Sequence, residues 1–278
     1  MDTFKLIKFL KTDESILSED TDLSICLSAD GFFFSLIDKR YRLKAIGEFK
    51  VDLNSGITAV MSNLRKCFAE VDIRLFNFNK IRIITPTNKN IFIPHKLYDN
   101  TKSKEYLRSV SLITGTDTII ESISDRLDTV SVFATPMYQN SGIKILMPKA
   151  EFLSQHQIMA EYGFEISKLT NNTVVLHRRE EVCDIVIYKG SQFVLSNSFN
   201  FTNENDMIYH IIFTLDQLQI DTAEVTFLIT GSSYTLEEKQ MLSKFIKNVS
   251  YANPMETIKV GIEFDGLDIQ KYFLVLCK

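Results

Sequence analysis

The sequence contains little glycine: there are 10 glycines among 278 residues, about half of the usual share of roughly 7%. Glycine is needed wherever backbone N–H groups have to come close to phosphate oxygens. Two common phosphate-binding motifs, Gly-x-x-x-x-Gly-Lys-Ser/Thr and Gly-x-Gly-x-x-Gly, do not occur, and neither does the Gly-x-Ser-x-Gly nucleophile motif. The chain therefore has few places where its backbone can hold a row of phosphates.

The sequence also lacks clustered metal ligands. Its four cysteines are far apart and form no Cys-x-x-Cys motif: Cys26, Cys67, Cys183 and Cys277. We predict reduced, mostly buried thiols in a reducing compartment rather than disulfides. The four histidines are equally scattered, and no two ligand-type residues have the spacing of a zinc site. We therefore expect no metal site and no cofactor.

No stretch approaches the roughly 20 apolar residues that a membrane-spanning helix needs. Residues 1–15 (MDTFKLIKFLKTDES) have too short an apolar run for a signal peptide and carry lysines through it. We predict a soluble, cytoplasmic protein without membrane insertion, which leaves docking onto a membrane partner open. Acidic residues outnumber basic ones, 35 to 31, so no nucleic-acid partner is expected, because such binding depends on cations that neutralise phosphates.

The apolar patterns that are present indicate an α/β protein. After a lead-in over residues 1–22, strands are predicted at Leu23–Ala29, Phe32–Ile37, Leu43–Val51 and Lys80–Thr85. Asp30-Gly31 is typical of a type I′ hairpin turn, which needs positive φ at both positions. Ser55 is predicted to cap a helix, whose apolar residues recur at helical spacing: Ile57, Val60, Met61, Leu64, Cys67, Phe68 and Val71.

Residues 87–142 are less regular, and we predict a small inserted subdomain there. It contains a hairpin at Thr118–Ser124 and Thr129–Ala134. A strand is then predicted at Ile143–Met147, followed by a helix that starts at Pro148 and ends at a C-cap at Gly163.

The pattern then restarts. Strands are predicted at Thr173–Arg178, Val182–Tyr188 and Gln192–Phe201, followed by a helix at Glu204–Leu218 and an apolar strand at Val225–Ile229. In the third of these strands, alternation predicts one shared face for Phe193, Leu195, Phe199 and Phe201.

The last part begins with the turn Gly231-Ser232-Ser233. A capping box at Thr235–Glu238 predicts a helix that buries Leu242, Phe245, Ile246 and Val249. Two final strands are predicted, at Ile258–Phe264 and Tyr272–Leu276.

The two halves repeat with a constant spacing. Their first strands begin at 23 and 173, their second at 32 and 182 and their third at 43 and 193, so each offset is 150; the helices begin near 56 and 205, an offset of 149. Four matching offsets favour one α/β unit used twice over two unrelated α/β domains. We place the first half at residues 1–148, and a linking helix with the second half at 149–278.

Three segments carry a family resemblance: LSICLSADGFFFSLID (23–38), MIYHIIFTLDQLQID (207–221) and FLITGSS (227–233). Three antiparallel strands, a helix, a parallel strand and a helix is the order of the ribonuclease H-like fold. Two such halves joined by a helix resemble the actin-like ATPase superfamily. The chain most resembles an uncharacterised bacterial domain-of-unknown-function family with this fold, and more remotely the cytoplasmic actin-like platform proteins of type IV pili. The resemblance implies mixed α/β sheets over nearly the whole chain.

Actin-like ATPases hold a nucleotide between the halves, so the resemblance implies a site for Mg-ATP if one binds. Asp30 and Gly31 would approach the phosphates and the magnesium ion, and Gly231 and Ser232 the rest of the nucleotide. However, three phenylalanines follow Asp30-Gly31, which favours a plain tight turn, and the corresponding turn Arg178–Glu181 has no glycine. Two of the three loops thus depart from the pattern that ATP hydrolysis needs.

We therefore expect a non-catalytic actin-like protein, a scaffold or regulator that binds an unidentified protein partner. The alternative is an ATP-binding ATPase or small-molecule kinase with divergent phosphate loops. A ribonuclease H-like nuclease ranks last, because Asp30 has no second carboxylate that can be placed beside it, and Asp184 belongs to the other half.

Overall fold

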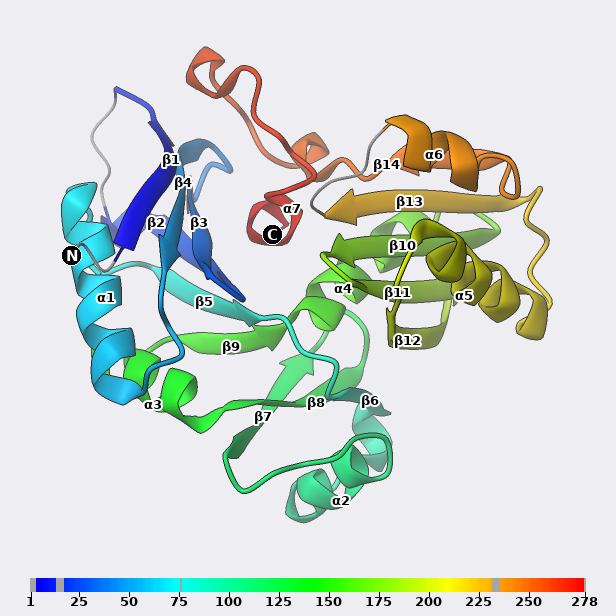
Figure 1. The fold of residues 1–278 in the computed structure, drawn as a ribbon, viewed down its shortest axis with the longest axis horizontal. Helices are drawn as coiled ribbons and strands as arrows, with labels where there is room; N and C mark the ends of the chain where they lie inside the picture. Colours follow the sequence, from blue (N-terminus) through cyan, green and yellow to red (C-terminus); the bar gives the residue numbers. More distant parts are fainter. Residues whose placement is uncertain (1–3, 14–17, 76, 232–235, 278) are drawn as a thin grey trace.

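The computed structural model describes residues 4–13, 18–75, 77–231 and 236–277 (Figure 1). They form two large mixed sheets and one three-stranded sheet. In Figure 1 the large sheets lie on the left and right, and the small sheet lies below and between them. The predicted fold class, mixed α/β sheets in two halves, is confirmed. The boundary at residue 148 and the description of residues 87–142 as an insertion stay predictions.

The first large sheet has the strand order β1-β4-β3-β2-β5-β9. Its strands are β1 (Phe4–Lys11), β2 (Thr21–Ser28), β3 (Gly31–Asp38), β4 (Leu43–Val51), β5 (Lys80–Thr85) and β9 (Glu151–Ser154). The first four in this order pair antiparallel, whereas β2, β5 and β9 pair parallel. Helices α1 (Ile57–Glu70) and α3 (Met137–Leu146) cover one face of this sheet.

The second large sheet has the order β12-β11-β10-β13-β14, the same succession as β4-β3-β2-β5-β9. Its strands are β10 (Asn172–Arg179), β11 (Val182–Lys189), β12 (Gln192–Asn200), β13 (Val225–Gly231) and β14 (Asn248–Tyr251). Helices α5 (Glu204–Gln217) and α6 (Leu236–Leu242) lie on its outer face, over an apolar cluster that includes Leu176, Ile211 and Leu242. Each half therefore has three antiparallel strands, a helix and a parallel strand, as the repeat predicts, and β9 and β14 each add a second parallel strand that it does not predict.

The small sheet has the order β6-β8-β7, and it contains the hairpin that the sequence predicts. Its strands are β6 (Asn90–Pro94), β7 (Asp117–Ser124) and β8 (Thr129–Pro136). The short helices η2 (His95–Leu97), η3 (Asn100–Lys102) and α2 (Ser103–Arg108) lie at its far end. A separate small core that includes Ile93, Leu107 and Val130 holds these elements together.

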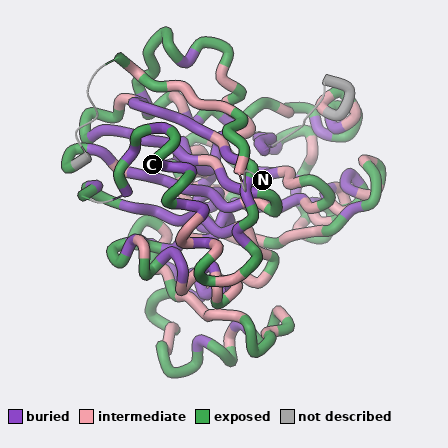
Figure 2. Tube along the Cα trace, turned by 60° about the vertical axis from the view of Figure 1, so that its left-hand side comes forward, coloured by how far each residue is buried: buried purple, intermediate pink, exposed green. Residues whose placement is uncertain are grey.

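The central strands of both large sheets are buried on both faces, so successive residues enter different cores. In β2, Leu23, Ile25 and Leu27 face the core under α1, whereas Cys26 faces the core between the halves. Figure 2 shows this as continuous buried segments through the strands. All four cysteines are buried and free, as predicted.

The core between the halves is built around α4 (Gln155–Ser167) and the single turn α7 (Phe273–Leu276). It receives Ile46 and Ile84 from the first sheet and Val175 and Val186 from the second. All four side chains of α7 are buried, and the Ser35 hydroxyl donates a hydrogen bond of 2.6 Å to the carbonyl of Val275. A continuous apolar layer therefore joins the two sheets. None of the helices in the described residues has the length and apolar character to cross a membrane.

Several predicted elements near the middle of the chain are wrong. The predicted strand Ile143–Met147 belongs to α3 instead. This helix comes close to α1 at Gly142, because glycine has no Cβ; a Cβ there would meet the Val60 side chain at 2.9 Å. The predicted helix from Pro148 is instead β9 followed by α4, which Ser154 caps by accepting the N–H of Gln157 at 3.2 Å. Gly163 does not end this helix; it lies inside α4, against the Tyr188 ring.

The two predicted C-terminal strands are also wrong. Ile262–Phe264 is a short 3-10 helix (η5), and Tyr272–Leu276 contains α7. A short run of apolar residues does not distinguish a buried strand from a buried helical turn by periodicity. The run Tyr272–Leu276 fills the space between the two large sheets and does not extend either of them.

Smaller errors concern ends and faces. Gly56, not Ser55, is the N-cap of α1, and the Ser55 hydroxyl instead donates to Asp52. A bulge in the pairing of β11 with β12 turns Phe193 to the face of Tyr188, away from Leu195 and Phe199.

In the last predicted helix, Leu242 and Ile246 are buried as predicted. However, α6 ends at Leu242, Phe245 is 53% exposed and Val249 lies in β14. Thr235, the first residue of the predicted capping box, lies outside the described residues.

Replacing Phe273 by alanine should destabilise the whole protein, because this ring is fully buried between the halves. We expect a loss of about 3–5 kcal/mol in the free energy of unfolding, measured by urea denaturation. The matched variant Phe245→Ala removes a ring that is 53% exposed and should cost within about 0.5 kcal/mol. Equal losses in the two variants would contradict the role of α7 as the joint between the sheets.

Candidate functional site

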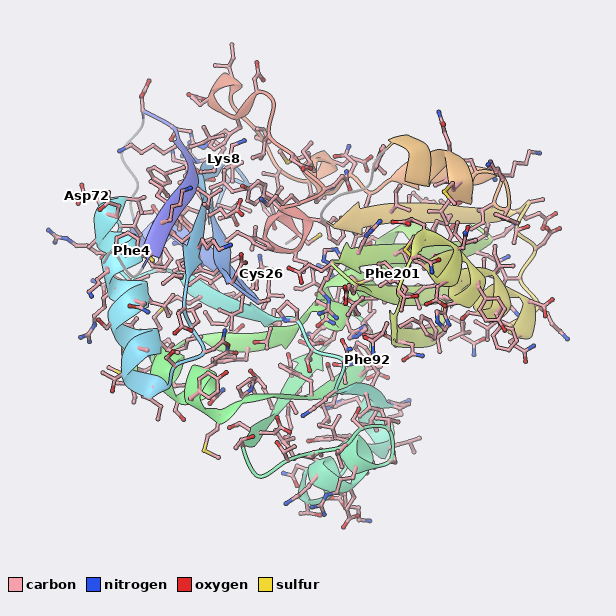
Figure 3. The ribbon with its side chains drawn as sticks, viewed as in Figure 1. Phe4, Lys8, Cys26, Asp72, Phe92 and Phe201 are labelled. Carbon is pink, nitrogen blue, oxygen red and sulfur yellow. The ribbon has the colours of Figure 1, made fainter. Side chains whose placement is uncertain are left out.

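A cleft of about 620 Å³ opens between the two halves, where the ends of several strands meet. The first half contributes the end of β2, the turn after it and the end of β5; the second contributes residues 177–182, and the C-terminal segment contributes Lys271 and Leu274. In Figure 3, Cys26 at the end of β2 and Phe201 after β12 lie on opposite sides of the space between the halves. This is the position at which the resemblance places a nucleotide.

The first-half turn reaches this cleft, but with a different geometry from the predicted one. Ala29 and Asp30 occupy the turn of the β2–β3 hairpin, and neither they nor Gly31 has a positive φ. The type I′ prediction is therefore wrong. Gly31 is the first residue of β3, and a Cβ there would collide with the carbonyl oxygen of Phe49. Glycine at this position allows β3 to pack closely against β4, and it does not serve an approach to phosphate.

Asp30 lines the cleft, and its carboxylate forms an ion pair of 2.9 Å with Lys50. The hydrogen bond from Lys50 lowers the pKa of Asp30. Both side chains are about 60% exposed, so the pair is solvated and contributes little to stability. The only carboxylate among the predicted site residues is thus balanced by a lysine of the same half.

Gly231 does not reach the cleft. It ends β13 opposite Arg178, with a φ of 102°, and a Cβ would collide with the Arg178 carbonyl oxygen. Its N–H donates a hydrogen bond of 3.1 Å to the carbonyl of Gln270, so this donor is not available to an anion. Ser232, the fourth predicted site residue, lies outside the described residues. The structure therefore brings Asp30, but neither Gly31 nor Gly231, to the described lining of the cleft.

The turn Arg178–Glu181 lines the cleft, and its two arginines are directed at groups of the protein. Arg178 lies 3.5 Å from Glu204 and stacks over the Phe201 ring at 5.2 Å. Arg179 donates two hydrogen bonds, of 2.7 and 2.9 Å, to the two carboxylate oxygens of Asp184. Arg179 also donates to Asn88 at 2.8 Å, which connects this turn to the start of the small sheet.

Asp184 lies at the centre of a buried polar network that the sequence analysis did not identify. The Ser198 hydroxyl donates to Asp184 at 2.6 Å and lies 3.0 Å from Nε2 of His156. Because Ser198 gives its proton to Asp184, it accepts from His156, so Nε2 carries the histidine proton. Nδ1 of His156 then accepts from the Ser196 hydroxyl at 2.8 Å. The only sequence signal was an aspartate inside the apolar strand VCDIVIY.

This network is not a catalytic triad. Asp184 approaches His156 only to 3.7 Å, and its charge is already balanced by the bidentate Arg179. Burial lowers the pKa of His156, so the ring is neutral near pH 7. Burial alone would raise the pKa of Asp184, but the Arg179 hydrogen bonds and the nearby charges lower it to about 2. The groups form a structural ion pair with its hydrogen bonds satisfied.

His177 is the second buried histidine at the cleft. Its side chain is 4% exposed, and its Nδ1 has no hydrogen-bond partner among the described residues. Burial lowers the pKa of His177 from 6.5 to about 4. Burial also raises the pKa of the Cys26 thiol in the lining of the same cleft, so this cysteine is not a nucleophile at neutral pH.

The described cations of the cleft lining are paired within the protein. Each of the three has a carboxylate partner: Arg178 with Glu204, Arg179 with Asp184, and Lys271 with Glu48 at 2.7 Å. Among the described residues, no group of three or more His, Cys, Asp or Glu side chains could hold a metal ion. Of the two carboxylates considered for a ribonuclease H-like nuclease, Asp30 pairs with Lys50 and Asp184 pairs with Arg179.

Comparisons with known proteins agree with the fold. A family described as "Protein of unknown function (DUF3822)" matches residues 11–249. No curated protein matches the sequence. The chain is similar to a solved Bacteroides thetaiotaomicron protein with an actin-like ATPase fold and unknown function, with 25% identity, a TM-score of 0.74, and coverage of 90% of this chain and 96% of that one.

The chain is also similar to a chain of the PilM–PilN type IV pilus biogenesis complex, with 11% identity and a TM-score of 0.63. The match covers 92% of this chain and 96% of that one. At this identity the likeness shows the fold alone. Together the comparisons confirm the predicted resemblance to an uncharacterised actin-like family and, more remotely, to the pilus proteins.

Replacing Arg179 by methionine should destabilise the protein by about 3–5 kcal/mol, because it leaves Asp184 charged and buried without its partner. The double variant Arg179→Met/Asp184→Leu removes both charges and should be more stable than the single variant. Urea denaturation of the two single variants and the double variant gives the coupling energy. A double variant that is less stable than Arg179→Met would argue against this account.

The His177 ring makes stability depend on pH. The unfolded chain takes up a proton near pH 6.5, whereas the folded chain does so only near pH 4, so stability falls as the pH drops through this window. Between pH 7.5 and 4.5, the free energy of unfolding should fall by about 2–3 kcal/mol more in wild type than in His177→Phe. This variant keeps an aromatic ring beside Phe273. The measurement is the free energy of unfolding at each pH. Parallel pH profiles for the two proteins would refute this assignment.

Proposed function

This chain belongs to the DUF3822 family, and we propose that it is a non-catalytic actin-like scaffold that binds an extended segment of a partner protein. Two features support this function. The described cations of the cleft between the halves already have carboxylate partners, and a second groove has the geometry to hold a peptide. We place the scaffold in the cytoplasm, in keeping with its four free cysteines.

The cleft argues against ATP chemistry through its charges. A triphosphate needs cations or a metal ion to balance it, and each described cation of the lining already has a carboxylate partner. Releasing Arg179 would leave Asp184 unpaired in a buried position, at a cost of several kcal/mol. The hairpin turn at Asp30 presents a carboxylate and its lysine rather than a row of N–H donors.

The observation that carries the proposal is a groove of about 1020 Å³ between the small sheet and the first large sheet. One wall is the length of β7, from Thr118 to Ile123, and the other includes β9. Both β7 and β9 are the terminal strands of their sheets. Two strand edges thus face one groove, and no described strand pairs with the outer side of either.

An extended peptide suits such a groove, because a sheet edge offers backbone donors and acceptors to a further strand. Ile119, Ile120 and Ile123 of β7 line the groove together with Phe152 and Leu153 of β9. Ile123 is 60% exposed and is open to a partner. The PilM–PilN complex shows that a chain of similar fold occurs in a complex with another protein, which supports a protein partner here.

Replacing Ile123 by lysine should abolish partner capture without unfolding the protein, because this side chain is mostly exposed and lines the groove. The measurement is crosslinking of the tagged chain in lysate of its source cells, followed by mass spectrometry. Recovery of the partner should fall at least about tenfold. The matched variant Ile262→Lys, at an 81% exposed isoleucine outside the groove, should capture as wild type does.

Isothermal titration of the same preparation with ATP and ADP in the presence of magnesium separates the alternative function. Neither heat nor a thermal shift is expected at millimolar nucleotide. Saturable binding would identify the protein as an ATP-binding ATPase or kinase with divergent loops. Capture that is equal for Ile123→Lys and Ile262→Lys would remove the groove from the proposal.

A further inference from the structure

The far end of the small sheet exposes three large apolar side chains. Leu97 is 71% exposed, Val110 is 56% exposed and Leu112 is 84% exposed. All three lie within residues 95–112, which contain η2, η3 and α2 and which we call the tip. Single exposed apolar residues are common on protein surfaces, but three on one small projection indicate an interaction site.

The tip is a fixed structure. Leu107 is fully buried beneath it, and the Tyr106 hydroxyl donates to the Leu97 carbonyl at 3.3 Å, which ties η2 to α2. The hydroxyls of Tyr98 and Ser103 lie 2.8 Å apart, and Ser103 also donates to Glu121 of β7. The exposed leucines are therefore presented from a packed support.

The charge of the tip is opposite to that of the rest of the chain. It carries four basic residues, Lys96, Lys102, Lys104 and Arg108, and two acidic ones, Asp99 and Glu105, for a net charge of +2. The whole chain has a net charge of −4, so the remaining residues sum to −6. An anionic surface would attract the tip more than the rest of the molecule, which orients the molecule before contact.

The position of the tip allows contact with a flat surface. In Figure 1, α2 lies at the lower end of the molecule, away from both large sheets, and in Figure 2 the same lower end is largely exposed. The apolar side chains therefore project from an end of the molecule.

We propose that the tip docks onto an anionic membrane surface, with the apolar side chains in the headgroup region and the basic side chains against lipid phosphates. The composition favours lipid over protein. Protein interfaces are enriched in Tyr, Trp and Arg and depleted in Lys, and Leu and Val are under-represented among their energetic centres. The exposed large apolar residues of the tip are Leu and Val, and three of its four basic residues are Lys. Apolar anchors with a cluster of cations are the two signals that peripheral membrane binding combines.

The test is co-sedimentation of the full chain with vesicles of phosphatidylglycerol and phosphatidylcholine, and with vesicles of phosphatidylcholine alone. We expect the chain to bind the vesicles that contain phosphatidylglycerol and not those of phosphatidylcholine alone. Binding should weaken as the salt concentration rises, because exposed charges are screened. The variant Leu97→Asp/Leu112→Asp should reduce binding at least about tenfold, and so should Lys104→Glu/Arg108→Glu.

The matched control is Leu169→Asp, at a leucine that is 86% exposed on the linker after α4 and outside the tip. It should bind as wild type does, and thermal unfolding of every variant shows whether the fold is kept. Absence of binding to anionic vesicles would overturn the proposal, and so would equal binding by the tip variants and Leu169→Asp. A soluble acidic protein that competes for the tip, with no vesicle binding, would assign the surface to a protein instead.

Discussion

The packing of α7 between the two large sheets is the contact on which the rest of the molecule depends. Each sheet has one face covered by its own helices, α1 and α3 on one and α5 and α6 on the other. The opposite faces would be exposed if the halves were separate. The four buried side chains of α7, together with α4, fill the space between them. Burial of this apolar surface fixes the relative position of the halves, and with it the shape of the cleft.

The described cations of the cleft are paired with carboxylates of the protein. Hydrogen bonds cross between distant parts of the chain at the rim of the cleft: Arg179 reaches Asn88, and both Lys271 and Tyr272 reach Glu48. The same actin-like architecture therefore presents a stable set of surfaces, among them the groove between β7 and β9.

The regular elements were predictable because their residues repeat with a clear period. The helix at α5 and the three-strand repeat followed from apolar spacing alone, and the sheet order then matched in both halves. The errors fell where tertiary packing decides the conformation of a short apolar run. Tyr272–Leu276 became a helical turn because it lies between two sheets, and Ile143–Met147 joined α3 because Gly142 allows close contact with α1.

The candidate site was less predictable than the fold, since its geometry depends on partners far apart in sequence. The structure places Asp30 in the lining of the cleft, but its pairing with Lys50 of β4 is not visible as a motif. Asp184, His156 and Ser198 come from three elements and meet only in the folded chain. Gly231 fits a binding loop in sequence, and only its N–H bond to Gln270 shows that its donor is already used.

The location of α7 in the chain has a consequence for how the protein reaches its fold. Val275 accepts a hydrogen bond from Ser35, 240 residues earlier, and Cys277 accepts one from Arg82, 195 residues earlier. Contacts across such separations close very long loops, and the entropy of loop closure slows their formation. The hairpins of each half are local, so we expect them to form before these contacts. We therefore expect the joining of the two sheets at α7 to be the slow step of folding, with their inner faces accessible to chaperones until then.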